Sequence, residues 1–134
     1  MSTLKKKGVK KKDDADVKKV RAQIKGKYAE LVAAWFLRFK GYQILASNFK
    51  TKVGEIDLIA RKGTTLCFIE VKKRATKAEA AEAISSRQKA RIIRAAEQFI
   101  GHHSRYLSFD KRFDAVLIGA TVIPYHIENA WQDD

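Results

Sequence analysis

The sequence predicts an α/β domain in which a mixed sheet is flanked by helices. Two long segments have apolar residues at three- and four-residue steps, which is the period of an amphipathic helix. Five shorter runs are rich in β-branched and aromatic residues and are separated by turn residues, as strands are. In chain order these elements read α-β-β-β-α-β-β. We therefore expect one sheet with helices packed against it.

The first helix is expected over residues 23–40 and ends at Gly41. Glu30 is a carboxylate within one of its mostly apolar faces. The helix is apolar on most of its circumference, so we expect it to be covered on two sides. Its broader apolar stripe consists of Tyr28, Leu31, Val32, Trp35, Phe36 and Phe39, and the opposite stripe consists of Gly26, Glu30, Ala33 and Leu37.

The strands are expected over residues 42–48, 55–61, 66–72, 113–118 and 122–127. Residues 62–65 predict a hairpin loop, and residues 73–86 fit a loop or a short helix equally well. The second long helix begins at an N-cap of Ser85 or Ser86 and reaches about Phe99. Its apolar face consists of Ile92, Ile93, Ala96, Phe99 and Ile100, and a separate face carries Arg87, Arg91 and Arg94.

Size and composition exclude several classes of protein. The chain has 134 residues, of which 46% are hydrophobic, so it can form one domain with one core. Its single cysteine, Cys67, excludes an intrachain disulfide framework and a cysteine-rich zinc site. No apolar run approaches the roughly 20 residues that span a bilayer, and no secretion signal is recognisable. We therefore expect a cytoplasmic protein with no membrane partner.

The positive charge is concentrated near the N-terminus. The whole chain carries 28 Lys and Arg against 15 Asp and Glu, and residues 1–27 alone carry 11 basic and 3 acidic residues. Residues 1–21 have almost no apolar residues and no helical period. We predict a disordered basic arm over residues 1–21 and a single domain over residues 22–134. Such an arm suits phosphate binding, and a tail that serves only solubility fits as well.

Two carboxylates and a lysine are predicted to meet in the central hairpin. Strand alternation places Glu70 and Lys72 on one face of their strand. A loop centred between positions 63 and 64 places Asp57 opposite Glu70 and Glu55 opposite Lys72, with Cβ atoms about 4.5–5.5 Å apart. Two carboxylates at that distance repel each other unless a cation or a proton lies between them.

All-oxygen ligands suit Mg²⁺ or Mn²⁺ rather than zinc. A lysine beside two carboxylates and such a metal can orient or deprotonate a water that attacks a phosphate. If the first helix packs on this end of the sheet, Glu30 adds a third acid. In the alternative interpretation, Glu55 and Lys72 form an ordinary exposed ion pair, and Asp57 and Glu70 face solvent.

The same residues carry a family resemblance. Residues 54–60 (Gly-Glu-Ile-Asp-Leu-Ile-Ala), residues 68–72 (Phe-Ile-Glu-Val-Lys) and Arg74 resemble the core of the PD-(D/E)xK nuclease superfamily. More closely, the chain from about residue 22 to 131 resembles the YraN family of small bacterial proteins, which are similar to archaeal Holliday-junction resolvases. The resemblance implies a restriction-endonuclease-like fold. It also implies metal ligation by Asp57, Glu70 and the Val71 carbonyl, with Lys72 as the catalytic lysine and Glu30 as a helix-borne acid.

The resemblance implies an endonuclease that depends on Mg²⁺ or Mn²⁺ and hydrolyses DNA phosphodiesters, with branched or structured DNA suggested by the resolvases. Where the family usually has Lys-Gln early in the second helix, this chain has Gln88-Lys89. A non-catalytic nucleic-acid-binding module and a subunit that docks through its apolar helix stay open as alternatives, as does a homodimer. The expected nucleic-acid contacts are Arg74, Arg87, Gln88, Lys89, Arg91 and Arg94.

Other candidate residues favour structural roles. His102, His103 and His126 lack spaced partners for a metal site and fit loop or surface positions. Cys67 is expected in the core, facing away from the acids. We expect Asp114 to make structural hydrogen bonds, and Trp35 and Trp131 to be packing residues.

Overall fold

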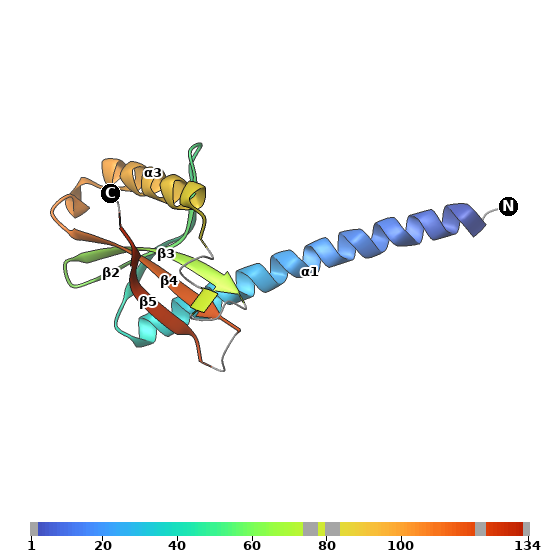
Figure 1. Cartoon of the computed structure of the whole chain (residues 1–134), viewed down its shortest axis with the longest axis horizontal. Helices are drawn as coiled ribbons and strands as arrows, with labels where there is room; N and C mark the ends of the chain where they lie inside the picture. Colours follow the sequence, from blue (N-terminus) through green and yellow to red (C-terminus); the bar gives the residue numbers. More distant parts are fainter. Residues whose placement is uncertain (1–2, 74–77, 80–83, 120–122, 133–134) are drawn as a thin grey trace.

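The sheet and helices follow the predicted order. The computed structural model describes residues 3–73, 78–79, 84–119 and 123–132, and for residues 3–12 and 22–25 it describes the backbone (Figure 1). Arg74, one of the expected nucleic-acid contacts, and residue 122, the expected start of the last strand, lie outside the described residues. The elements are α1 (Thr3–Phe39), β1 (Gln43–Lys50), β2 (Glu55–Lys62), β3 (Thr65–Lys73), α3 (Ser86–His102), a 3₁₀ turn (Ser104–Tyr106), β4 (Asp110–Ile118) and β5 (Tyr125–Trp131). The predicted α/β class and the element order are confirmed.

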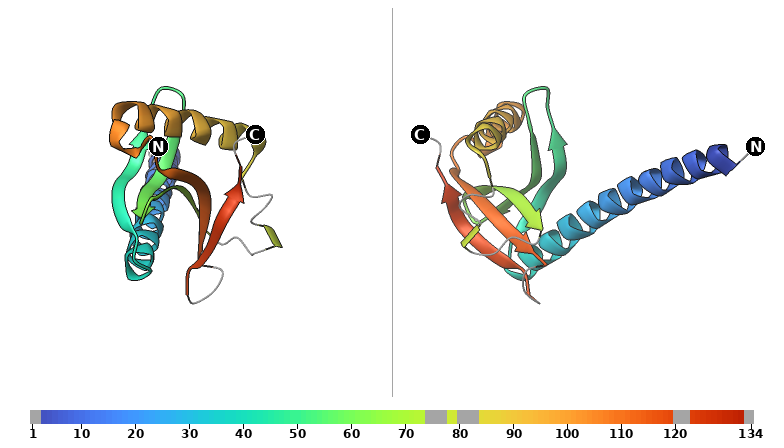
Figure 2. Two further views of the ribbon diagram at one scale, coloured as in Figure 1. Left: turned by 90° about the vertical axis from the view of Figure 1, so that its left-hand side faces the viewer. Right: turned by 45° about the vertical axis from the view of Figure 1, so that its right-hand side comes forward.

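The five strands lie in the sheet in chain order. All neighbouring pairs are antiparallel except β3 and β4, which are parallel. A parallel pair needs a crossover connection, and α3 lies in that connection. Figure 2 shows α3 on one face of the sheet and the C-terminal part of α1 on the other. The domain is therefore a helix–sheet–helix sandwich.

Each sheet face has its own core. On the α3 face, Phe68 packs with Phe99 and Phe113, and Trp131 stacks on Phe113 with ring centroids 5.5 Å apart. On the α1 face, Cys67 and its neighbours on β3 pack against alanines of α1. The predicted alternation of β3 is confirmed, since Leu66 and Phe68 lie on one side and Cys67, Ile69 and Val71 on the other.

The first helix is expected to be covered on two sides, but among the described residues only one of its apolar faces packs on the sheet. Ala33 and Leu37 are fully buried against the sheet, whereas Trp35 and Phe39 on the broad stripe are exposed. The expectation that Trp35 is a packing residue is wrong, because the small alanine side lets the helix backbone approach the sheet and the aromatic side then faces outward. The helix is covered on one side within the described structure.

The N-terminal segment is expected to be a disordered arm over residues 1–21. In the structure α1 begins at Thr3, so most of this segment is helical. This part of α1 extends away from the sheet (Figure 1). Lysine and alanine are good helix formers, and Asp14 precedes Lys18 by four residues, a spacing that stabilises helices. A segment without an apolar period can therefore still be helical. The division between an arm and a domain stays a prediction.

Gly41 ends α1 as expected. Its φ is 93°, in the left-handed region that glycine tolerates. The Tyr42 amide donates to the Leu37 carbonyl, and the Gly41 amide donates to the Arg38 carbonyl, both at 3.0 Å. These two bonds form a Schellman motif, which satisfies the last carbonyls of the helix and turns the chain into β1.

A buried polar cluster joins β4 to β5. Asp114 is fully buried and accepts hydrogen bonds from Arg112, from His126 Nε2 at 2.8 Å and from the Asn129 amide at 2.9 Å. The structural role expected for Asp114 is confirmed. The surface position expected for His126 is wrong, because its side chain is 1% exposed. Lys40 Nζ lies 2.6 Å from the other ring nitrogen of His126 and ties the end of α1 to this cluster.

Candidate functional site

The central hairpin has the predicted register. Leu58 pairs with Ile69 and Lys62 with Thr65, so Asp57 and Glu70 occupy the next opposed positions. The described ladder ends at Leu58 and Ile69. Beyond it the Asp57 carboxylate, rather than a backbone carbonyl of β2, accepts a hydrogen bond of 2.8 Å from the Val71 amide. This contact fixes the Asp57 side chain between β2 and β3.

Asp57 and Glu70 influence each other electrostatically. Each carboxyl group raises or lowers the pKa of the other, so the two side chains titrate as an interacting pair. Burial and the neighbouring Asp57 charge raise the pKa of Glu70 to about 8. Burial also raises the pKa of Asp57, although the Val71 amide opposes this effect. The pair therefore needs positive charge to be fully ionised at neutral pH.

Lys72 supplies part of that positive charge. Its Nζ lies 3.5 Å from Glu70 Oε1 and 3.4 Å from Gln88 Oε1. The expected partner Glu55 forms no ion pair with Lys72 among the described contacts, and in the sheet Glu55 is opposite Lys50 of β1. Lys72 is thus directed to Glu70 of the carboxylate pair and not to Glu55.

Gln88 closes the site from α3. Ser85 caps this helix by accepting a hydrogen bond from the Gln88 amide at 3.1 Å, so the first turn is fixed. Gln88 Nε2 then donates to Glu70 Oε1 at 2.7 Å. The sequence analysis expects Gln88 to contact phosphate. In the structure its side-chain amide contacts Glu70 and Lys72.

Gly54 determines how closely α3 approaches. A Cβ at this position would lie 2.3 Å from the Arg91 carbonyl oxygen, so only glycine fits between the start of β2 and the backbone of α3. The motif glycine therefore has a packing role that the sequence does not reveal.

Glu30 reaches the same region from α1. It accepts a hydrogen bond of 2.8 Å from Asn48, which is opposite Asp57 in the β1–β2 register and has a φ of 51°. Burial raises the pKa of Glu30, and the charges of Asp57 and Glu55 raise it further. Glu30 thus lies close enough to Asp57 for the Asp57 charge to affect its pKa. The contribution of Asn48 depends on an unusual backbone conformation that periodicity does not predict.

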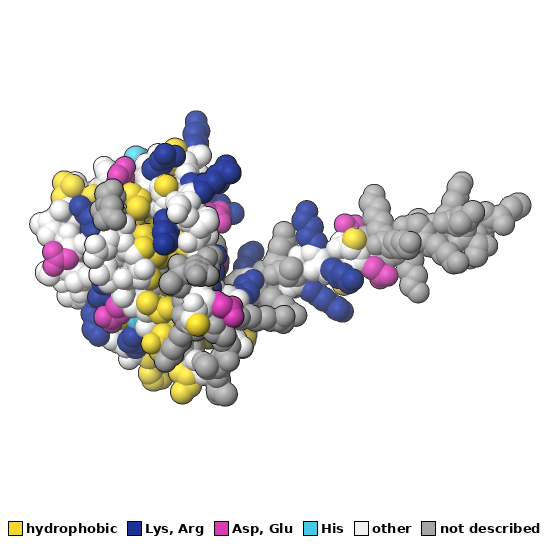
Figure 3. Space-filling view, viewed as in Figure 1, with side chains coloured by type: hydrophobic (Ala, Val, Ile, Leu, Met, Phe, Trp, Pro, Cys, Tyr) yellow, Lys and Arg dark blue, Asp and Glu magenta, His cyan; other side chains and the backbone are white. Residues whose placement is uncertain are grey.

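A cleft opens beside these residues. Its volume is about 610 Å³, and Glu55, Glu70, Gln88 and Arg91 line it together with Ser85 and Arg87. A neighbouring groove of about 360 Å³ shares Arg87 and Arg91 and is lined further by Lys52, Val53, Ala90 and Arg94. Figure 3 shows the basic side chains gathered over α3 and the β1–β2 hairpin. Lys89 lines neither hollow.

The donor set fits a hard divalent cation. Mg²⁺ is commonly held by one or two carboxylates together with water and substrate phosphates, and Asp57 and Glu70 supply two carboxylates. A cation held by both carboxylates would supply the positive charge that lets both ionise at neutral pH. Within the described ranges no three His, Cys, Asp or Glu side chains gather into a larger metal cluster. The role of the Val71 carbonyl stays a prediction.

Comparison with known proteins finds a matching family model and many similar proteins. The model of the uncharacterised protein family UPF0102 matches residues 29–118. The chain is 44% identical over 117 residues to a UPF0102 protein of Paramagnetospirillum magneticum, covering 84% of this chain and 91% of that protein. It is 42% identical over 118 residues to a UPF0102 protein of Chelativorans, covering 88% and 95%. The matched region contains every described residue of the site.

Proposed function

The chain belongs to the uncharacterised family UPF0102, the YraN family, and from its site we propose that it is a divalent-metal-dependent nuclease acting on DNA. Family membership confirms the resemblance seen in the sequence and names no activity. The observation that carries the proposal is the Asp57–Glu70 carboxyl pair with Lys72 beside it, at the edge of a basic cleft.

Asp57 and Glu70 would hold Mg²⁺ or Mn²⁺, and the bound cation would polarise a phosphoryl oxygen and lower the pKa of a water molecule. Lys72 would place its positive charge beside the developing negative charge of the phosphate. Gln88 would hold Glu70 and Lys72 in position through its two contacts. Glu30 would add negative charge on the α1 side and favour cation binding.

The basic groove supports a nucleic-acid substrate. Arg87 and Arg91 line both the cleft and the neighbouring groove, and Lys52 and Arg94 extend the positive surface away from the carboxylates. Such side chains position phosphates without reading base sequence. A DNA strand that follows the groove into the cleft would therefore bring one phosphate to the metal held by Asp57 and Glu70. Branched DNA is favoured only by the resemblance to resolvases.

A cleavage assay tests the proposal. Purified protein is incubated with labelled four-way junctions and matched linear duplexes, with Mg²⁺, with Mn²⁺ or with a chelator. We expect metal-dependent cuts, and loss of several orders of magnitude in rate in Asp57→Ala, Glu70→Ala and Lys72→Ala, while DNA affinity stays within about tenfold.

The matched control is Lys111→Ala, which removes a lysine of β4 outside both basic hollows. It should cleave as the wild type does. Full activity of purified Lys72→Ala would remove that lysine from the mechanism. Binding without cleavage under every metal condition would favour the non-catalytic binding module.

A further inference from the structure

The outer face of α1 carries a concentration of exposed apolar side chains. Phe39 is 91% exposed, Tyr28 67% and Trp35 61%. Single exposed apolar residues are ordinary, but a contiguous set on one element marks an interaction surface. Six large apolar side chains of the described part of α1 are exposed, and we call them the α1 stripe: Val17, Val20, Tyr28, Leu31, Trp35 and Phe39.

The α1 stripe is one continuous face. Its members follow each other at three- and four-residue steps from Tyr28 to Phe39, as the knobs of a helix pair do. The buried residues Ala29, Ala33 and Leu37 lie on the opposite side of the helix against the sheet. The helix therefore has one apolar face packed within the domain and a second, more aromatic face exposed.

The stripe is large enough for a stable helix pair. From Val17 to Phe39 it extends about 33 Å along the helix at 1.5 Å per residue. Its three aromatic side chains are 61–91% exposed, so a partner can cover roughly 90–230 Å² of each. With Leu31 and the two valines, the total approaches the roughly 800 Å² per partner of a standard interface.

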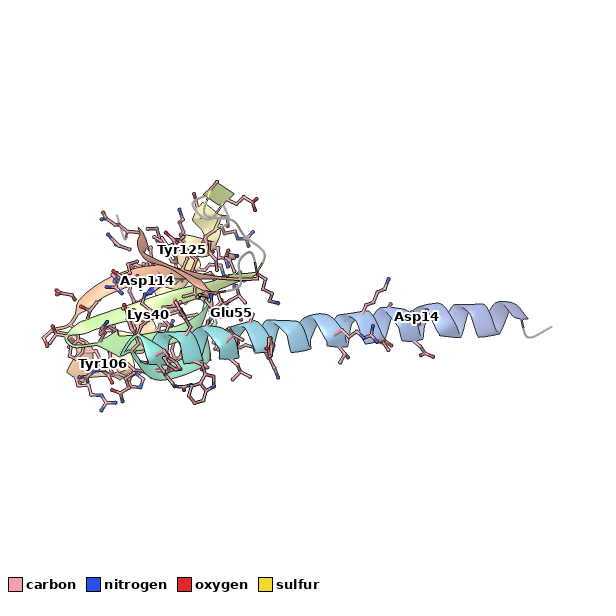
Figure 4. The ribbon with its side chains drawn as sticks, turned by 90° about the horizontal axis from the view of Figure 1, so that it is seen from below. Asp14, Lys40, Glu55, Tyr106, Asp114 and Tyr125 are labelled. Carbon is pink, nitrogen blue, oxygen red and sulfur yellow. The ribbon has the colours of Figure 1, made fainter. Side chains whose placement is uncertain are left out.

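The charges beside the stripe favour a second copy of this chain. Asp13, Asp14 and Asp16 lie at its outer end, on the part of α1 that projects from the body (Figure 4). Arg38 lies at its inner end. At 100° per residue, Asp13 and Arg38 are about 20° apart around the helix axis, so both flank the same side of the stripe. An antiparallel copy would bring the acidic end of each helix to the Arg38 end of the other.

We infer that α1 mediates an antiparallel homodimer through the α1 stripe. A parallel pair would place the aspartates beside aspartates and the lysines of residues 1–19 beside lysines, which is unfavourable. The two-fold symmetric arrangement uses the same surface on both copies, as closed dimers do. This inference goes beyond the proposed nuclease function and does not depend on it.

The test measures the mass of the full-length chain by light scattering over a wide range of concentrations, after nucleic acid has been removed. We expect twice the mass of one chain, with dissociation on dilution. The double variant Leu31→Glu with Trp35→Glu should be monomeric and keep its circular dichroism spectrum, because both side chains are exposed. The matched control is Leu107→Glu, which changes an equally exposed leucine outside the stripe and should leave the dimer intact.

Charge reversal tests the antiparallel orientation. Asp13→Lys with Asp14→Lys should weaken the dimer about tenfold, and Arg38→Glu should weaken it by a similar factor. Combining the three changes should restore most of the affinity, since the opposed charges are only exchanged. A wild type with the mass of one chain at every concentration would overturn the inference. The inference would also be overturned if the dimer persisted in the Leu31→Glu, Trp35→Glu variant. A third contrary result would be a monomeric wild type whose DNA binding those two changes abolish, because the stripe would then be a DNA-binding surface.

Discussion

Gln88 Nε2 donates a hydrogen bond of 2.7 Å to Glu70 Oε1, and this contact links the first turn of α3 to the carboxylate in the middle of β3. The same Gln88 side chain accepts from Lys72 through its Oε1 atom. One amide thus orients both a candidate metal ligand and the candidate catalytic lysine. Residues with this role are positioning residues, and their loss commonly costs 10–100-fold in metal affinity or activity.

Gln88→Ala should therefore reduce metal-dependent cleavage by about 10–100-fold while DNA affinity changes less than about threefold. The neighbouring substitution Lys89→Ala is the matched control, because Lys89 lines neither the cleft nor the groove. Cleavage rates and binding isotherms of the two variants are compared under the same conditions. Equal effects of the two substitutions would show that Gln88 has no special position.

The contact of Gly54 with α3 gives a prediction about stability. Gly54→Ala would place a Cβ 2.3 Å from the Arg91 carbonyl oxygen, so the start of β2 and α3 must separate. We expect a loss of about 1–3 kcal/mol in the free energy of unfolding, together with reduced cleavage. Denaturant titrations measure the first effect.

Gly101→Ala is the control for this glycine substitution. Gly101 lies in α3, and an added Cβ meets nothing within 4 Å. It should stabilise the protein by about 0.5–1 kcal/mol, because alanine is the better helix former. If both glycine substitutions destabilise equally, the close approach at Gly54 is not the cause.

The buried Asp114 predicts a pH dependence of stability. Burial alone would raise its pKa, but the hydrogen bonds from His126 and Arg112 outweigh burial and lower the pKa below its ordinary value. A lowered pKa in the folded state stabilises the protein above the pKa of the unfolded chain. This contribution is lost as the pH falls through the folded pKa.

Asp114→Asn should therefore destabilise the protein by about 3–5 kcal/mol at neutral pH, because the partly buried Arg112 and the buried His126 lose the negative charge that they contact. The difference from the wild type should shrink as the pH is lowered below about 4. Urea unfolding at several pH values measures both stabilities. A difference that stays constant down to pH 2 would contradict the assignment of a low pKa to Asp114.

The basic N-terminal segment predicts a salt effect on DNA binding. Deleting residues 1–12 removes six lysines but leaves the α1 stripe and its aspartates in place. Each lost phosphate contact should reduce the slope of log affinity against log salt by about 0.9. Fluorescence titrations at several salt concentrations measure the slope, and cleavage at saturating DNA should be retained. An unchanged slope would identify the segment as a solubility tail.

The register of the central hairpin could be predicted from the sequence because local information determines it. A short loop at positions 63 and 64 and the alternation of β3 together fix which residues oppose each other, and the observed ladder agrees from Leu58 to Lys62. The start of α3 was predictable for the same reason, since Ser85 caps it as expected, whereas the helix continues to His102 beyond the expected end at Phe99.

Contacts between distant segments could not be predicted in this way. Periodicity shows that α1 has two apolar faces, but it does not say which one packs on the sheet. That choice depends on how closely the alanines let the helix approach. The Gly54–Arg91 approach, the Asn48–Glu30 hydrogen bond and the burial of His126 likewise join residues far apart in sequence.

The most direct test of the site measures thermal stability with and without metal. At about pH 9, above the Glu70 pKa of about 8, both carboxyl groups of the metal-free wild type are ionised. Asp57→Asn removes one of these charges, so the metal-free variant should then be more stable than the wild type by about 1 kcal/mol. Added Mg²⁺ or Mn²⁺ should stabilise the wild type, because a ligand that binds only the folded state shifts the equilibrium, and the variant should lose most of this gain. Asp110→Asn, at an exposed position of β4, is the control and should respond to metal as the wild type does. If Asp57→Asn is no more stable than the wild type without metal and gains equally from metal, the proposed metal site is wrong.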